Sequence, residues 1–271
     1  MLTHIRGRNG YVALKLDLKK AYDRLEWPFI KESLDFFQVL PNFITLIMNM
    51  LSSTRFHIQW NEAPLPEVIP SRGVWQGDTL SPYLFILCLE HLSILLEEAI
   101  QEKLIHPIGF KGQVCISHLF FADDIFLFTQ AKTRDYKNLI RMLQQFYQCS
   151  GQLMSLNKSR IWFSPNTSRG LKQQVVGIFG IPPTDHIGIY LGTPIFTTCR
   201  IANSYQYLVE KIRMKIEGYQ AKYLSMVGQA TLVKSSMASI PLYAMQTMLL
   251  PQKSSHHLDQ LSCKFLWGDT T

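Results

Sequence analysis

Aspartates stand at the ends of β-prone stretches that lie far apart in the chain, and this pattern limits the folds available to it. Residues 11–18 are mostly apolar and partly β-branched or aromatic, which predicts a buried strand with Asp17 at its end. Residues 116–121 and 125–128 are two more β-prone runs, and the intervening segment 122–124 predicts a hairpin with acids at its tip. Carboxylates that converge from rigid strands can hold two Mg²⁺ ions about 3.5–4 Å apart. The pattern therefore indicates a metal site shared by distant segments.

Asp123 and Asp124 are adjacent, and strict alternation along a strand would send their side chains to opposite faces of a sheet. Both carboxylates can approach a site shared with Asp17 only if the chain turns at this point, which the hairpin allows. The alternative is that Asp123 and Asp124 are turn formers and that Asp17 is a surface acid. The spacing alone leaves these two interpretations open.

The rest of the chain combines helices with a pair of strands. Helical spacing of apolar residues and helix-start signals predict helices over residues 26–37, 41–51, 80–102 and 136–149. Residues 55–60 and 67–75 are interpreted as paired strands around a proline-rich link at 63–66. From about residue 202 the pattern is helical, with helices predicted over residues 204–218, 228–248 and 256–267 and interruptions at Gly218, Pro241 and Pro251.

Composition limits the function classes. Hydrophobic residues make up 47% of the chain, enough for a core, and 27 Lys and Arg against 20 Asp and Glu give a charge of +7, which favours an anionic partner. The five cysteines are widely spread and form no Cys-x-x-Cys pair, so neither a disulfide framework nor a zinc ribbon is indicated.

The chain also lacks the patterns of secreted and membrane proteins. Its first residues have no apolar segment of the secretory kind. The longest apolar stretch, residues 80–96, contains Glu90 and His91, which indicates a buried helix and not a membrane span. These features predict a soluble intracellular protein, nuclear or cytoplasmic.

Five motifs then give the chain a resemblance to a known family. Residues 15–27 resemble motif A of the reverse transcriptases of LINE-type, non-LTR retrotransposons, especially those of plant genomes, and residues 72–82 resemble motif B. Motifs C, D and E are matched by residues 121–124, 151–159 and 190–194, in the order that the family has. A weaker resemblance continues in residues 223–230, 239–243 and 265–268.

The resemblance implies a fold class and a domain organisation. The fold would be α+β, with a right-hand polymerase palm, an antiparallel sheet backed by helices, over residues 1–198. A helical and truncated thumb or connection region would follow over residues 199–271. The motifs A to E all lie within the first of these domains.

The resemblance also implies an activity, which is RNA-directed DNA polymerisation by two-metal nucleotidyl transfer to a primer 3′-hydroxyl. Its partners would be an RNA template, a DNA primer and deoxynucleoside triphosphates, with no membrane. Its cofactors would be two Mg²⁺ ions, with Mn²⁺ as a substitute. Asp17 and Asp123 would ligate both metals, the Leu18 backbone carbonyl would help, and Asp124 would act less directly.

Three further residues would contact the nucleotide. Tyr22 would be the aromatic gate that stacks under the incoming sugar and excludes a 2′-hydroxyl, whereas the alternative is an aromatic anchor between strand and helix. Gln76 and Gly77 would line the nucleotide and template side, where glycine permits close backbone approach. Without the resemblance, residues 77–79 would be only a helix cap.

The remaining roles concern the leaving group and the nucleic-acid strands. Lys158 would lie near the pyrophosphate, where it donates a proton or neutralises charge, unless it is an ordinary solvated lysine. Leu191 and Gly192 would form the primer-grip turn, unless this is an ordinary β-turn. A set of basic residues would follow the nucleic-acid backbone, although a solvated helix face is the preferred explanation for any single one of them: Lys211, Arg213, Lys215 and Lys222.

In the family a fingers region precedes motif A, whereas Asp17 is residue 17 of this sequence. The resemblance therefore predicts a fragment that lacks the fingers, the endonuclease and the C-terminal zinc-binding segment, with little activity in isolation. The alternative function is that of a catalytically silent nucleic-acid-binding remnant of a decayed element. An intron-maturase-like protein would need a basic domain after the thumb, which this sequence lacks.

Overall fold

The computed structural model describes residues 10–109, 115–195, 205–218, 224–246 and 249–267. Its contacts divide the chain into two units, an N-terminal unit that ends at Gly188 and a C-terminal unit that begins at Ile189. The boundary expected between residues 198 and 199 lies outside the described residues. Because the C-terminal unit begins at Ile189, motif E at residues 190–194 belongs to it, with the helices that follow.

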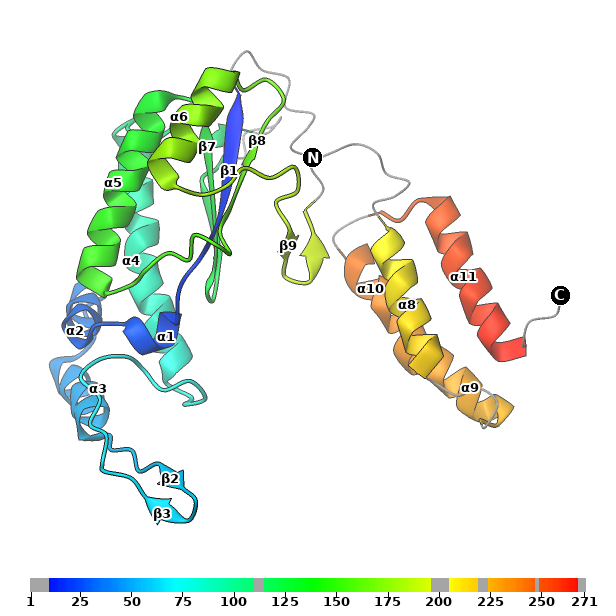
Figure 1. Cartoon of the computed structure of the whole chain (residues 1–271), viewed down its shortest axis with the longest axis horizontal. Helices are drawn as coiled ribbons and strands as arrows, with labels where there is room; N and C mark the ends of the chain where they lie inside the picture. Colours follow the sequence, from blue (N-terminus) through cyan, green and yellow to red (C-terminus); the bar gives the residue numbers. More distant parts are fainter. Residues whose placement is uncertain (1–9, 110–114, 196–204, 219–223, 247–248, 268–271) are drawn as a thin grey trace. The chain divides into compact units, whose positions relative to one another are not determined.

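The N-terminal unit alternates helices and strands along the chain (Figure 1). Its helices are α1 (Ala21–Arg24), α2 (Trp27–Phe36), α3 (Pro41–Ser53), α4 (Ser81–Gln101), α5 (Thr133–Ser150) and α6 (Arg169–Phe179). Its strands are β1 (Tyr11–Asp17), β2 (Gln59–Trp60), β3 (Ala63–Pro64), β4 (Ile108–Gly109), β5 (Cys115–Ile116), β6 (His118–Phe121), β7 (Asp124–Gln130) and β8 (Arg160–Phe163). The mixture of helix and sheet confirms the α+β class, and all four expected helices are present.

The main sheet of the described residues has four strands in the order β6-β7-β1-β8, and the strand pairs are antiparallel. The expected strand at residues 11–18 is its β1, and the expected hairpin is its β6 and β7. Strand β8 was not predicted, because four residues are too short a run to separate a strand from a loop by pattern. Helix α6, with 11 residues, was not predicted either.

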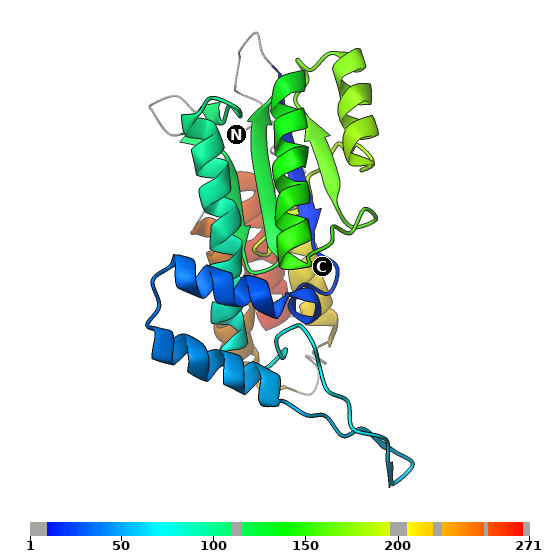
Figure 2. The ribbon, with the colours of Figure 1, turned by 90° about the vertical axis from the view of Figure 1, so that its left-hand side faces the viewer.

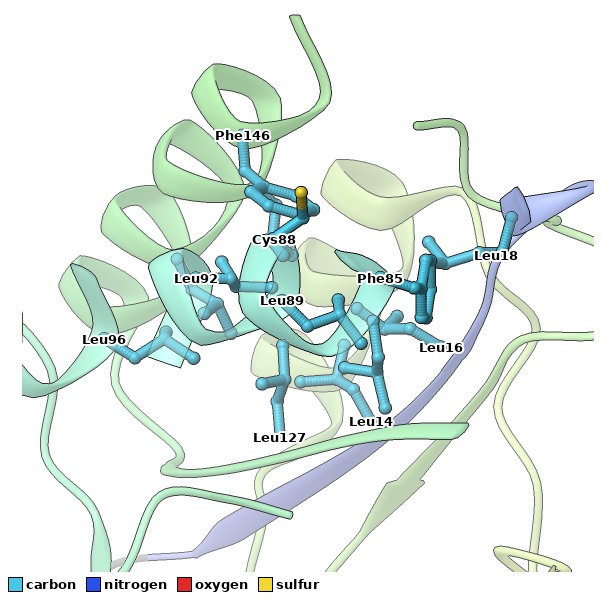
Figure 3. Close-up of a cluster of buried hydrophobic side chains, with 14 of the residues drawn as sticks. Leu14, Leu16, Leu18, Phe85, Cys88, Leu89, Leu92, Leu96, Leu127 and Phe146 are labelled. Carbon is cyan, nitrogen blue, oxygen red and sulfur yellow. The ribbon is translucent and has the colours of Figure 1, made fainter. Parts of the chain in front are cut away.

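The core lies between this sheet and helices α4, α5 and α6, which cover one of its faces (Figures 1 and 2). Leu14 and Leu16 of β1 point to that face and meet Phe85 and Leu89 of α4, together with Leu127 of β7 (Figure 3). Alternation sends the intervening side chains of β1 to the opposite face. One strand therefore contributes to this core and to a second face, which is buried and apolar at Ala13 and becomes polar at Lys15 and Asp17.

Residues 55–75 differ from the expectation of two strands separated by a proline-rich link. Strand β2 pairs directly with β3, so the link itself forms part of the ribbon, and Phe56 pairs with Val68 in an isolated bridge. Asn61 and Glu62 make the turn with positive φ angles of 47° and 66°, the conformation of tight hairpin turns. The expected position of the turn was therefore wrong.

The C-terminal unit begins with a short hairpin of β9 (Ile189–Tyr190) and β10 (Thr193–Pro194). Its helices are α8 (Gln206–Gly218), α9 (Met226–Leu232), the π-helical turn η3 (Val233–Met237), α10 (Ser239–Met245) and α11 (Gln252–Trp267). A separate core forms around Leu208, Ile212, Met237, Leu258 and Phe265. The expected helical texture is confirmed, although Pro241 lies in the first turn of α10 and does not end a helix.

None of the helices in the described part of the chain is long and apolar enough to cross a membrane. The apolar stretch for which the sequence predicted a buried helix forms most of the long helix α4, and its side chains Leu92 and Leu96 are buried in the core.

His118 of β6 is enclosed between two hydroxyl groups, with Ser93 Oγ 2.9 Å from its Nε2 and Ser117 Oγ 2.9 Å from its Nδ1. Burial lowers the pKa of His118 below its ordinary value, and the carboxylates of Glu97 and Glu90 oppose this shift without cancelling it. The folded chain therefore binds a proton at this ring less readily than the unfolded chain does.

We expect His118 to make the fold less stable in acid. The pKa of His118 in the folded chain lies below its unfolded value of about 6.5. Its contribution to the free energy of unfolding is therefore complete above about pH 6.5 and is lost as the pH falls through the folded pKa. Urea unfolding at pH 8 and pH 5 should show a smaller loss of stability for His118→Gln than for the parent. An equal loss in both proteins would contradict this assignment.

Candidate active site

Two of the sequence-predicted aspartates lie opposite each other at one end of the sheet. Asp17 is the last residue of β1 and Asp124 the first of β7, and the antiparallel register pairs them directly. Directly opposed residues of such a pair project to the same face, with Cα atoms about 4.5–5.5 Å apart. That face is the one turned away from helices α4, α5 and α6. The structure thus brings together segments that the sequence separates widely.

Asp123 lies beside this pair, in the two-residue turn that joins β6 to β7. Ala122 supplies the other turn residue, and its φ of 50° is in the left-handed region that residues with a side chain seldom adopt. Because the chain reverses here, Asp123 is released from strict strand alternation. The hairpin predicted from the sequence is confirmed, with Asp124 already inside the strand.

Ala122 should tolerate glycine far better than a β-branched residue. We expect Ala122→Val to lower the stability by about 1–2 kcal/mol, because the left-handed conformation crowds a branched Cβ, whereas Ala122→Gly should be neutral or stabilising. Urea unfolding midpoints of the two variants measure the difference. Identical midpoints would mean that the turn relaxes to a negative φ without cost.

Each paired aspartate has a lysine beside it. Lys15 Nζ lies 3.2 Å from Asp124 Oδ1, and Lys158 Nζ lies 3.9 Å from Asp17 Oδ1. Lys15 also lies over the ring of Phe126, 5.4 Å from its centroid, on the same sheet face. The lysines balance the charge of two carboxylates that would otherwise repel each other. Lys158, assigned from the sequence to the leaving group, is thus next to the acids.

The segment from Gly151 to Ser159, which contains motif D, runs along the end of β1 and along α1. Arg24 Nε donates to the Gly151 carbonyl over 3.0 Å, and Gln152 Nε2 donates to the Ala21 carbonyl over 2.8 Å. At Asp17 itself, the backbone N–H donates to Ser159 Oγ over 3.1 Å. Sequence reasoning assigned no role to Ser159, although its position directly after Lys158 in motif D was a usable signal.

Tyr22 of α1 is half-buried and stacks on Phe85 of α4, with ring centroids 4.8 Å apart and an interplanar angle of 17°. Its carbonyl accepts a hydrogen bond from the Val74 N–H over 2.9 Å, which attaches the first part of motif B to motif A. A Cβ at Gly73 would lie 2.7 Å from the Asp23 carbonyl oxygen, so this close approach requires glycine. The ring therefore serves as an anchor in the structure, whatever else it does.

Gln76 and Gly77 form an exposed turn before α4, and Gly77 has a φ of 109°. A Cβ built at Gly77 meets no atom within 4 Å, so its glycine is required by backbone conformation and not by crowding. The Leu80 N–H donates to Asp78 Oδ1 over 3.5 Å, but Leu80 is itself the N-cap residue of α4 and no side chain caps the helix, so the cap expected at residues 77–79 is not formed. The role of Gln76 and Gly77 toward a nucleotide stays a prediction.

Leu191 and Gly192 make the turn of the β9–β10 hairpin, with φ angles of 48° and 73°. The hydroxyl of Tyr243 on α10 donates to the Leu191 carbonyl, so a helix of the same unit supports this turn. Lys211, Arg213 and Lys215 are exposed on α8, whereas Lys222 lies outside the described residues.

The donor set at the sheet end suits a hard divalent cation, because carboxylate and carbonyl oxygens are the ligands that Mg²⁺ prefers. The hydrogen bonds of Asp17 to Ser155 and Ser159 lie on the β8 side of β1, so the adjacent Leu18 carbonyl faces the β7 side. Within the described ranges, no three His, Cys, Asp or Glu side chains are grouped closely enough to hold an ion. The chemistry of the residues fits, while lysines now neutralise the two opposed acids.

Opposed carboxylates at one end of an antiparallel sheet are the kind of arrangement that metal-dependent nucleotidyl transfer uses. The family model described as "Reverse transcriptase (RNA-dependent DNA polymerase)" matches residues 3–225, and the chain belongs to this family. Reverse transcriptases as a family use divalent metal ions. The resemblance seen in the motifs is thereby confirmed.

Two retrotransposon proteins are among its relatives. The Retrovirus-related Pol polyprotein from type-2 retrotransposable element R2DM of Drosophila melanogaster is 30% identical over 130 residues, 48% of this chain and 12% of that protein. The Transposon TX1 uncharacterized 149 kDa protein of Xenopus laevis is 24% identical over 281 aligned residues, 98% of this chain and 20% of that protein. These relatives support a reverse transcriptase of the LINE type. The chain spans between 12% and 20% of their length.

Among solved structures, telomerase from Candida tropicalis in complex with a TWJ fragment of telomeric RNA matches 96% of this chain and 39% of that chain. The TM-score is 0.46 and the sequence identity is 14%.

Proposed function

We propose that this reverse transcriptase domain joins deoxynucleotides to a primer 3′-hydroxyl by two-metal catalysis at the end of β1 and β7, in a palm whose thumb is the helical C-terminal unit. The observation that carries the proposal is the direct cross-strand pairing of Asp17 with Asp124, next to Asp123 in the turn. Oxygen ligands that converge from neighbouring segments are what this chemistry requires, and these three acids would supply them.

Asp17 and Asp123 would hold two Mg²⁺ ions, with the Leu18 carbonyl as a further ligand and Asp124 as a support. When bound, the ions activate the 3′-hydroxyl and neutralise charge on the attacking and leaving oxygens. Lys15 and Lys158 would exchange their ion pairs for contacts with phosphate oxygens. Lys158, whose side chain is 74% exposed, is the freer of the two to follow the leaving pyrophosphate.

The remaining contacts concern the substrates, which are an RNA template, a DNA primer and deoxynucleoside triphosphates. Gln76 and Gly77 would line the nucleotide and template side, and the turn at Leu191 and Gly192 would hold the primer. The exposed cations of α8 would follow the nucleic-acid backbone. A charge of +7 over the chain supports a polyanionic partner.

Tyr22 is proposed as the gate against ribonucleotides. We expect Tyr22→Ala to reduce the preference for deoxynucleotides by about tenfold or more, because the ring no longer blocks the 2′-hydroxyl, while Tyr22→Phe retains the preference. The ratio of kcat/KM for a deoxynucleotide and its ribonucleotide measures the effect independently of the folded fraction. Since Tyr22 also stacks on Phe85, Phe85→Leu is the control for loosened packing. A matching change in that control would assign Tyr22 to packing alone.

Metal binding and primer extension test the proposed function together. Mn²⁺ binding to the 271-residue chain is titrated by electron paramagnetic resonance, and extension of a DNA primer on an RNA template is measured with Mg²⁺. We expect Asp17→Asn to weaken both, while Asp35→Asn, an exposed acid on α2, changes neither.

Metal binding without extension would replace this function by the alternative of a silent nucleic-acid-binding protein. Metal binding that Asp17→Asn leaves unchanged would exclude the proposed site itself.

A further inference from the structure

The backbone of Asp17 is held differently from residues 12–15 of β1, which pair with β8, whereas Tyr11 at the other end of the strand has a similar contact, its N–H donating to Ser164 Oγ over 2.8 Å. The β1–β8 pairing runs from Val12 opposite Phe163 to Lys15 opposite Arg160 and ends there. Two residues further on, the Asp17 carbonyl accepts the Ser155 N–H over 2.8 Å, while the Asp17 N–H donates to the hydroxyl of Ser159 over 3.1 Å. A side-chain oxygen thus stands where a neighbouring strand would supply a backbone carbonyl.

Ser159 is built into the fold firmly enough to fix this contact. Its side chain is 0% exposed, and its own N–H donates to the Ser155 carbonyl over 2.9 Å. Both groups that bind the Asp17 backbone therefore come from one hydrogen-bonded turn. The intervening Lys158 reaches the Asp17 carboxylate from the same turn, at 3.9 Å.

We propose that Ser159 is a positioning residue that sets the orientation of Asp17 for metal binding, an inference that rests on the proposed function. The Asp17 N–H lies close to the proposed metal ligand in the covalent structure, since only Cα and Cβ separate it from the carboxylate carbon. Removal of its acceptor lets the strand end move or admits water, and a displaced carboxylate binds metal less well. Groups that orient metal ligands typically alter metal affinity by about 10- to 100-fold when they are removed.

Ser155 provides a matched control. It is a second buried serine of the same turn, and it binds Asp17 through its backbone N–H, which alanine retains. Ser155→Ala and Ser159→Ala therefore remove the same atom from the same turn, but only the second removes an acceptor from Asp17. Any effect of a shortened buried side chain on the stability of the turn should appear in both variants.

The test measures Mn²⁺ affinity by electron paramagnetic resonance, the Mg²⁺ concentration for half-maximal primer extension, and the urea unfolding midpoint. We expect Ser159→Ala to weaken Mn²⁺ binding by about tenfold or more and to raise the Mg²⁺ requirement in parallel. Ser155→Ala should leave both metal readouts near those of the parent, and Ser159→Thr, which keeps the hydroxyl, should restore most of the affinity. Amide hydrogen exchange at Asp17 should accelerate in Ser159→Ala only.

Equal Mn²⁺ affinities for the two alanine variants would overturn the proposal, as would a loss that follows the unfolding midpoint in both. If Ser159→Ala does not fold, Ser159→Cys keeps the volume with a poor acceptor, and its Mn²⁺ affinity decides in the same way. Asp17→Asn is measured beside these variants. If it too leaves Mn²⁺ binding unchanged, the proposed function fails; if it abolishes binding while Ser159→Ala does not weaken it, only the positioning role fails.

Discussion

Asp123→Asn is expected to lower primer extension on the order of a thousandfold, whereas Asp124→Asn should lower it only on the order of tenfold. A metal ion contributes several kcal/mol of charge stabilisation, and each 1.4 kcal/mol corresponds to about a factor of ten in rate. Asp123 is exposed in the turn, but Asp124 is engaged by Lys15 at 3.2 Å. Asp123 is therefore the better candidate for the main metal ligand.

The two variants control for each other, because asparagine retains the turn-forming character of aspartate at both positions. Rates of single-nucleotide addition under saturating Mg²⁺ give the comparison. A larger loss for Asp124→Asn would make the register partner of Asp17 the principal ligand and would reverse the roles that the family resemblance assigns. Normal rates in both would remove the hairpin from the active site.

Asp135→Ala should have the largest effect on stability, about 3 kcal/mol, because it removes a fully buried carboxylate that serves several donors. Asp135 Oδ2 accepts the His106 backbone N–H at 3.0 Å and lies 3.3 Å from the Thr129 hydroxyl. The His106 ring nitrogen Nδ1 lies 3.0 Å from the same oxygen. The carboxylate thus ties the start of α5 to the chain before β4 and to the end of β7.

Urea unfolding measures this loss, with Asp35→Ala on the exposed face of α2 as the control. The control should lie within about 0.5 kcal/mol of the parent, as surface substitutions usually do. A small effect of Asp135→Ala would mean that water replaces the carboxylate at this point. The metal-binding readouts should stay unchanged in the folded fraction, since Asp135 lies at the opposite end of β7 from Asp124.

Much of this fold could be predicted because the long elements have strong patterns. The helix of α4 and the amphipathic helix of α5 follow from apolar spacing, and the hairpin follows from acids between two β-prone runs. Strand β8 could not be predicted, since its four residues depend on pairing with β1 for their conformation. The ribbon turn at Asn61 was missed because the prolines nearby gave a stronger local signal.

The residues of the candidate site could be predicted where the type of side chain determines their role. They could be predicted less well where the role depends on the register between strands. Carboxylates in motifs A and C identified Asp17, Asp123 and Asp124. The sequence pattern alone could not show which of the two, Asp123 or Asp124, lies opposite Asp17, because the register of a hairpin depends on the length of its turn. The structure places Asp124 there. Ser159 was missed for a related reason, since its contact with the Asp17 N–H depends on the fold, and its position directly after Lys158 in motif D was the signal that could have indicated it.

Because side chains alternate between the two faces of a strand, substitutions in β1 should have two different kinds of consequence. Loss of Leu14 or Leu16 damages the core and so removes fold and activity together, whereas loss of Asp17 leaves the core face intact. An inactivated copy of this gene segment should therefore still encode a chain that folds, resists proteolysis and accumulates. If the proposed function holds, such copies compete with active ones for the same template.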